Sequence, residues 1–170
     1  MSAFGIEGRV DRSNSMVMRE LAQDLAATWD PRNHPDEVSS WMSRPAILRR
    51  VASALGESVH AEVDRIVATG PGAIALGSAL SLTTGLPYFA VTEGDGFGSL
   101  HDGEIVVVVS ATSDGAGAEY PWTPPSSTIT VDCRLTVVAA GGPDNATTDR
   151  LTLFFLDPDG DMLVSERNSQ

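Results

Sequence analysis

The sequence predicts an α/β domain with a central, mainly parallel sheet, helices on both faces and a helical region before the core. An Ala- and Leu-rich segment, 73–82, has helical spacing and lies between two short apolar segments, 66–68 and 88–91, that we interpret as strands. The run 105–109 follows, and five consecutive β-branched apolar residues suit a strand covered on both faces. An order of strand, helix, strand and strand implies crossover connections and therefore a parallel sheet.

Length and composition indicate one globular domain. The chain has 170 residues and 42% hydrophobic residues, enough for a core of its own. We divide it into a loose arm (1–14), N-terminal helices (15–62), the core (63–156) and a tail (157–170). No apolar run approaches the length of a membrane span, and no secretory signal is recognisable, so we expect a cytoplasmic protein without a membrane partner.

The part before the core is expected to be helical. Residues 15–28 form an amphipathic pattern that ends before Pro31. A second helical region covers 38–63, with Pro45 as a first-turn residue of its main part and Gly56 as a dividing point.

Glycines and apolar patterns predict the remaining elements. Gly70-Pro71-Gly72 is expected to turn the first strand into the central helix, and Gly85 to end that helix. Segment 128–140 leaves two interpretations open, because its alternation fits a strand while its spacing also fits one face of a helix. A final strand is expected at 151–156, followed by a polar tail from Asp161.

The charge of the chain excludes some partners. It carries 23 acidic and 11 basic residues, all of the latter Arg, for a net charge of -12. Nucleic acid would be repelled and would find no basic patch, so we predict no nucleic-acid partner. A phosphate ligand would have to rely on backbone N–H groups, a metal or a few Arg.

Short sequence motifs give only weak support for a dinucleotide site or a metal site. Gly70 and Gly72 match the G-x-G-x-x-G/A dinucleotide fingerprint, with Glu93 about 20 residues further on, where a ribose-binding carboxylate belongs. Helical residues precede this unit, however, and Pro71 removes one backbone N–H. We therefore prefer a tight turn that needs Gly. The three histidines and the single cysteine lack metal-ligand spacing, so no metal site is predicted.

The core resembles the type I phosphoribosyltransferases, and orotate phosphoribosyltransferase most closely, over roughly 43–156. The resemblance rests on three parts of the sequence. They are residues 64–67 with the following segment 70–74, the turn at residues 84–87, and residues 101–104, which directly precede the third strand. It implies a three-layer domain of that family, commonly a homodimer, with a phosphorylated ribose or a nucleotide as ligand. No cofactor is predicted for the inactive form, and Mg²⁺ is the candidate cofactor if the chain is an active enzyme.

The resemblance also places candidate ligand-binding residues. In that family the loop after the third strand holds the ribose hydroxyls with two acidic residues and the 5′-phosphate with Thr-Thr-Gly. Val109 and Ser110 stand at the acidic pair here, so both carboxylates are missing. The candidates for the phosphate loop are Ser110, Thr112, Ser113, Asp114, Gly115 and Ala116. Those for the pyrophosphate loop are Thr69, Gly70, Pro71 and Gly72.

Other family residues are replaced as well. The Arg-Lys pair after the second strand has become Thr92 and Glu93, and the chain has no Lys for catalysis, so a leaving pyrophosphate loses its neutralising partners. We predict no catalytic residue and a non-catalytic nucleotide-binding, regulatory or assembly module. One alternative is a divergent active phosphoribosyltransferase of nucleotide synthesis or salvage that uses Asp114 and an Arg from a partner subunit. Another is dinucleotide binding through Gly70, Gly72 and Glu93.

Overall fold

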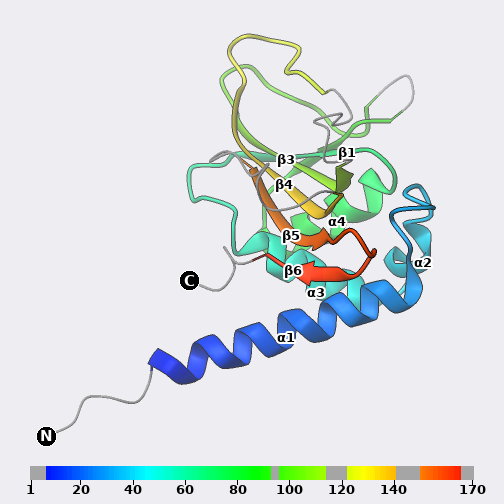
Figure 1. The fold of residues 1–170 in the computed structure, drawn as a ribbon. Helices are drawn as coiled ribbons and strands as arrows, with labels where there is room; N and C mark the ends of the chain where they lie inside the picture. The colour runs from blue at the N-terminus through cyan, green and yellow to red at the C-terminus, as the bar shows by residue number, and fades with distance from the viewer. Residues whose placement is uncertain (1–6, 93–95, 114–121, 141–149, 166–170) are drawn as a thin grey trace, which may run out of the picture.

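A six-stranded sheet forms the centre of the computed structural model, which describes residues 7–92, 96–113, 122–140 and 150–165 (Figure 1). Its strands are β1 (Arg65–Thr69), β2 (Tyr88–Ala90), β3 (Ile105–Ser113), β4 (Thr130–Ala140), β5 (Arg150–Leu156) and β6 (Met162–Val164). They lie in the order β2-β1-β3-β4-β5-β6, and only the edge pair β5–β6 is antiparallel. The mainly parallel sheet predicted from the sequence is confirmed.

Four helices occur in the described part of the chain. They are α1 (Glu7–Thr28), α2 (Ser39–Met42), α3 (Pro45–Gly56) and α4 (Ala73–Thr84). Pro45 lies in the first turn of α3, as expected. Gly72 and Gly85 flank α4 with φ of 70° and 77°, which are left-handed values that glycine adopts without steric strain. The predictions that Gly70-Pro71-Gly72 forms the turn before this helix and that Gly85 ends it are therefore confirmed.

The two faces of the sheet are covered differently. Buried residues of all four helices pack in one cluster with alternate strand residues such as Ile66, Val107 and Val109. On the other face, Val67, Val106 and Val108 pack with Ile129 and with partly buried residues outside the helices, including Leu100 and Trp122. The predicted sheet with flanking helices is therefore present.

Two helix boundaries differ from the prediction. α1 begins at Glu7 and lies alongside β6, so the arm expected over 1–14 is helical from Glu7 onward (Figure 1). No proline interrupts this stretch, and extending an existing helix is far easier than starting one. The helical region expected over 38–63 ends earlier, at Gly56, because Gly is a poor helix former and a turn follows.

The C-terminal part resolves an open question and corrects one prediction. Segment 128–140 contains β4, an eleven-residue strand that pairs with β3 and β5, so its β-branched residues are used in a sheet. The tail expected to be polar from Asp161 contains β6 instead. A turn closed by the Gly160 N–H donating to the Asp157 carbonyl (3.0 Å) allows β6 to pair with β5.

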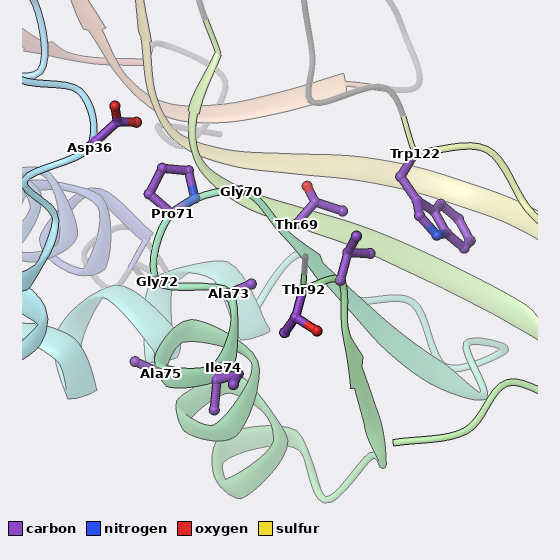
Figure 2. A pocket seen from close by; sticks show the side chains of 11 residues that line it. Asp36, Thr69, Gly70, Pro71, Gly72, Ala73, Ile74, Ala75, Thr92 and Trp122 are labelled. Carbon is purple, nitrogen blue, oxygen red and sulfur yellow. The ribbon is translucent and has the colours of Figure 1, made fainter. Parts of the chain in front are cut away.

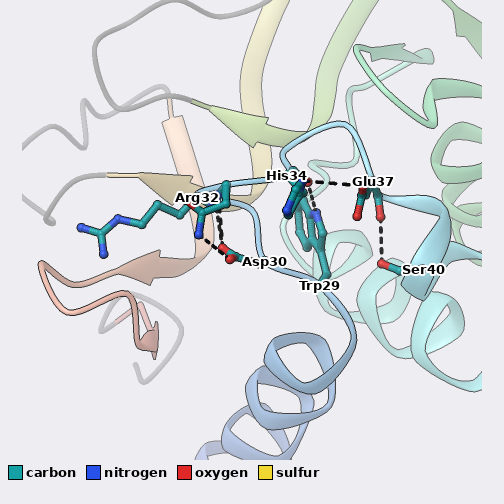
Figure 3. Close-up of polar contacts among 7 residues, drawn as sticks. Trp29, Asp30, Arg32, His34, Glu37 and Ser40 are labelled. Carbon is teal, nitrogen blue, oxygen red and sulfur yellow. Dashed lines mark hydrogen bonds and ion pairs between the residues drawn. The ribbon is translucent and has the colours of Figure 1, made fainter.

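The loop between α1 and α2 is held by polar contacts of its own (Figure 3). The Asp30 carboxylate accepts hydrogen bonds from the Asn33 side chain (2.7 Å) and from the Asn33 and Arg32 backbone N–H groups, and these bonds lower the pKa of Asp30. Arg32 Nη2 donates to the Pro158 carbonyl at 2.7 Å, which ties this loop to the β5–β6 turn. The loop carries Asp36 to the site described below.

A nearly buried ion pair joins the amino ends of β1 and β3. Arg65 Nε lies 3.0 Å from both Glu104 carboxylate oxygens, and Arg65 Nη2 lies 2.8 Å from Oε1. The two side chains are 11% and 14% exposed. The hydrogen bonds from Arg65 lower the pKa of Glu104 below its ordinary value of 4.5.

This lowered pKa predicts acid sensitivity with a defined sign. The stability that the charged Glu104 contributes is fully present above its unfolded pKa of 4.5 and is lost as the pH falls through its lowered folded value. We expect the difference in unfolding free energy between the wild type and Glu104→Gln to shrink steadily below about pH 4.5. Urea unfolding of both proteins from neutral to strongly acidic pH measures this difference. A difference that stays constant over the whole range would contradict the prediction.

Candidate functional site

A cavity of about 1030 Å³ opens where β1 and β2 end and α4 begins (Figure 2). The cavity lies at the carboxyl edge of the sheet, which is where ligands bind in parallel folds of this kind. We call it the carboxyl-edge cleft. Its described lining is Asp36, Thr69, Gly70, Pro71, Gly72, Ala73, Ile74, Ala75, Val91, Thr92 and Trp122.

All four candidates for the pyrophosphate loop line this cleft. Thr69 ends β1, is 3% exposed, and its Oγ1 lies 3.5 Å from the Val109 carbonyl oxygen. Gly70 and Gly72 follow with φ of 76° and 70°. The Ala73 N–H donates to the Gly70 carbonyl at 3.2 Å, so one N–H at the start of α4 is used within the turn. Both glycines are thus needed by the backbone of the turn itself.

The candidates for the phosphate loop are placed differently. Ser110, Thr112 and Ser113 belong to β3, which runs four residues beyond the predicted end at 109. Ser110 pairs with Thr69 on β1, and Thr112 pairs with Val138 on β4. The strand is longer because β4 extends to Ala140 and offers β3 a backbone partner along this length.

Neither Ser110 nor Thr112 is in the described lining of the cleft. Ser110 Oγ instead lies 3.4 Å from Thr136 Oγ1 across the sheet. Asp114, Gly115 and Ala116 lie outside the described residues, and so does Glu93.

Distant segments complete the cleft. Asp36 comes from the α1–α2 loop and Trp122 from the segment before β4, and sequence reasoning named neither of them as a site residue. Thr92, which follows the second strand and replaces a basic residue of the family, lines the cleft. Asp36 and Trp122 lack a local signal, because only the tertiary structure brings them to the end of β1. Within the described lining, Asp36 is the one residue with an ionisable side chain.

Two other described titratable groups lie outside the lining of the cleft. His60 Nδ1 lies 2.8 Å from Asp132 Oδ2, away from the cleft lining. Burial, reinforced by Asp132, raises the pKa of Cys133 to about 12, so this thiol stays protonated and is a poor nucleophile at neutral pH. Across the described ranges, no group of three His, Cys, Asp or Glu residues is arranged to hold a metal ion. No helix in these ranges combines the length and apolarity needed to cross a membrane.

Comparison with known proteins identifies the fold. No protein-family model matches the sequence, and no curated protein matches it. The structure, however, is similar to that of Mycobacterium tuberculosis orotate phosphoribosyltransferase, with a TM-score of 0.58 and 19% identity over 73% of this chain and 83% of that one. Leishmania donovani UMP synthase also has a TM-score of 0.58, with 20% identity over 70% of this chain. This chain spans 28% of the length of that protein.

Adenine phosphoribosyltransferases are similar as well. The protein from Leishmania tarentolae has a TM-score of 0.53 and 13% identity over 77% of this chain and 78% of that one. Identities of this size establish a shared architecture, not a shared activity. The chain therefore has the type I phosphoribosyltransferase fold that its sequence resembles.

Proposed function

We propose that this chain is a non-catalytic binding module on a phosphoribosyltransferase fold, with its ligand in the carboxyl-edge cleft. The observation that carries the proposal is the described lining of that cleft, which contains a carboxylate and no basic side chain. A departing pyrophosphate carries several negative charges, and stabilising charge as it develops is usually the largest part of such catalysis. The chain has no Lys to supply that stabilisation.

The phosphate-loop candidates support the same conclusion. Ser110 and Thr112 are paired within the sheet, so they are not part of a free loop around a phosphate. Asp114, which directly follows β3 in the sequence, carries a negative charge that would repel a 5′-phosphate. The M. tuberculosis orotate phosphoribosyltransferase was solved with 5-phospho-α-D-ribosyl 1-diphosphate, so this compound and nucleotides are the first ligands that the fold suggests.

We expect no phosphoribosyl transfer. Purified protein should form no nucleotide from phosphoribosyl diphosphate, Mg²⁺ and any of several bases, and calorimetry should give a Kd for phosphoribosyl diphosphate no tighter than about 1 mM. The Asp114→Ser variant is the matched test of repulsion, and it should bind phosphoribosyl diphosphate more tightly than the wild type does. Nucleotide formation that Asp114→Ala abolishes would overturn the proposal and establish the divergent enzyme.

The other expectations from the sequence remain predictions. A cytoplasmic homodimer is the setting that we infer, and light scattering of the purified chain tests its oligomeric part. An Arg of a partner subunit close to Asp114 would raise the case for the divergent enzyme. Dinucleotide binding through Gly70, Gly72 and Glu93 is tested by a thermal-shift titration with NAD, for which we expect no change in Tm.

A further inference from the structure

The carboxyl-edge cleft has the wrong charge for a polyphosphate. This inference rests on the ligand site proposed above. Apart from the Asp36 carboxylate and the hydroxyls of Thr69 and Thr92, its described lining consists of aliphatic residues, glycines, one proline and the indole of Trp122. In Figure 2, Asp36 and Trp122 lie on opposite sides of the turn that leads into α4. An anion in this cleft would meet a carboxylate and no basic side chain in the described lining.

The segments that follow the strands in the sequence are acidic as well. The segments 93–95, 114–121, 141–149 and 157–161 follow β2, β3, β4 and β5, whose carboxyl ends share one edge. Together they contain nine Asp or Glu and no Lys, Arg or His. Charges of one sign around a cleft raise the local concentration of ligands of the opposite sign. With Asp36 in the cleft and a net charge of -12, the chain therefore favours cations over phosphate esters.

Trp122 adds a preference for flat rings. Its side chain lines the cleft and is partly buried against the cluster of Val67, Val106 and Val108. The Trp122 carbonyl oxygen lies 3.5 Å from Arg134 Nη2, and Arg134 is not among the described lining residues. An indole offers a face on which a planar aromatic ligand can stack, and that face also attracts cations.

From these three observations we infer that the carboxyl-edge cleft binds an unphosphorylated, planar aromatic cation, with its ring on Trp122. The charge preference of the cleft is thus opposite to that of a site for phosphoribosyl diphosphate. The volume of about 1030 Å³ is large enough for a drug-sized ligand of two or three fused rings.

A series of three probes with one ring system tests the inference. N-methylquinolinium is cationic, quinoline is neutral at the pH of the assay, and quinoline-3-carboxylate is anionic. Ligand-detected NMR gives their Kd values at low salt, with phosphoribosyl diphosphate and Mg²⁺ as a fourth ligand. We expect the cation to bind about tenfold more tightly than the carboxylate, with quinoline between them, and this ratio to fall in about 1 M salt.

Two variants test whether Asp36 causes the preference for a cation and whether Trp122 holds the aromatic ring. Asp36→Asn should weaken binding of the cation about threefold and leave quinoline unchanged, because a single exposed carboxylate contributes modestly. Glu37→Gln is the matched control, since Glu37 is the neighbouring exposed carboxylate and is not in the described lining. Trp122→Ala should weaken all three probes about tenfold, in line with the usual strength of ring stacking on an aromatic side chain.

The outcomes separate this inference from the proposed function. If the carboxylate or phosphoribosyl diphosphate binds as tightly as the cation, the inference is wrong, while the cleft still stands as a ligand site. If no probe binds at millimolar concentration, the inference and the binding module both fail, and the fold has been kept for assembly. Tight cation binding that Trp122→Ala leaves unchanged also overturns the inference, because the ring would then lie elsewhere.

Discussion

The Arg65→Met variant is expected to lose about 3 kcal/mol of unfolding free energy, because it leaves the Glu104 carboxylate nearly buried and without its guanidinium. Three hydrogen bonds join the two side chains, so the loss includes the cost of an unpaired charge. The pair lies at the amino end of β1, opposite the cleft. Ligand affinity should therefore stay unchanged when urea unfolding shows the loss of stability.

An exposed ion pair provides the matched control. Arg50 and Asp24 also form a charged hydrogen bond, but their side chains are 33% and 49% exposed. Asp24→Asn should cost less than about 1 kcal/mol, because water screens such pairs. The double variant Arg65→Met/Glu104→Met should recover most of the loss, since it removes both charges. Equal losses for Arg65→Met and Asp24→Asn would show that burial does not strengthen the Arg65–Glu104 pair.

The Gly72→Ala variant is expected to lose about 2–4 kcal/mol. Gly72 has a φ of +70°, where an L-residue is strained by about 1–2 kcal/mol. An added Cβ would also lie 2.2 Å from Met42 Sδ and 2.9 Å from Val38 Cγ2, so buried side chains would have to move. Thermal or urea unfolding measures the total.

Gly85→Ala separates the two causes. Gly85 has a similar φ of +77°, but an added Cβ meets no described atom within 4 Å. This variant should show the backbone strain alone, about 1–2 kcal/mol. The additional loss of unfolding free energy in Gly72→Ala then measures the packing of the Gly70–Gly72 turn against Met42 of α2. If both variants lose the same amount, Met42 moves aside without cost, and the packing of Gly72 does not position the turn.

Local patterns determined the central unit of the fold. The alternation of short apolar segments with a helical segment predicted β1, α4, β2 and β3, because hydrophobic periodicity and glycine turns act over a few residues. The family resemblance pointed to Thr69–Gly72 as a ligand-binding loop, and these residues line the cleft. Charge also follows from the sequence alone, and a net charge of -12 without a basic patch predicts no nucleic-acid partner.

Tertiary contacts decided what those patterns left open. Segment 128–140 is a strand because β3 and β5 lie on its two sides, and a strand gains its hydrogen bonds from such neighbours. The same pairing carries β3 through Ser110 and Thr112, which local sequence placed in a loop. Asp36 and Trp122 both line the cleft although they are far apart in the chain. Local sequence patterns do not predict that these two residues share a cleft, because their positions depend on how whole elements pack together.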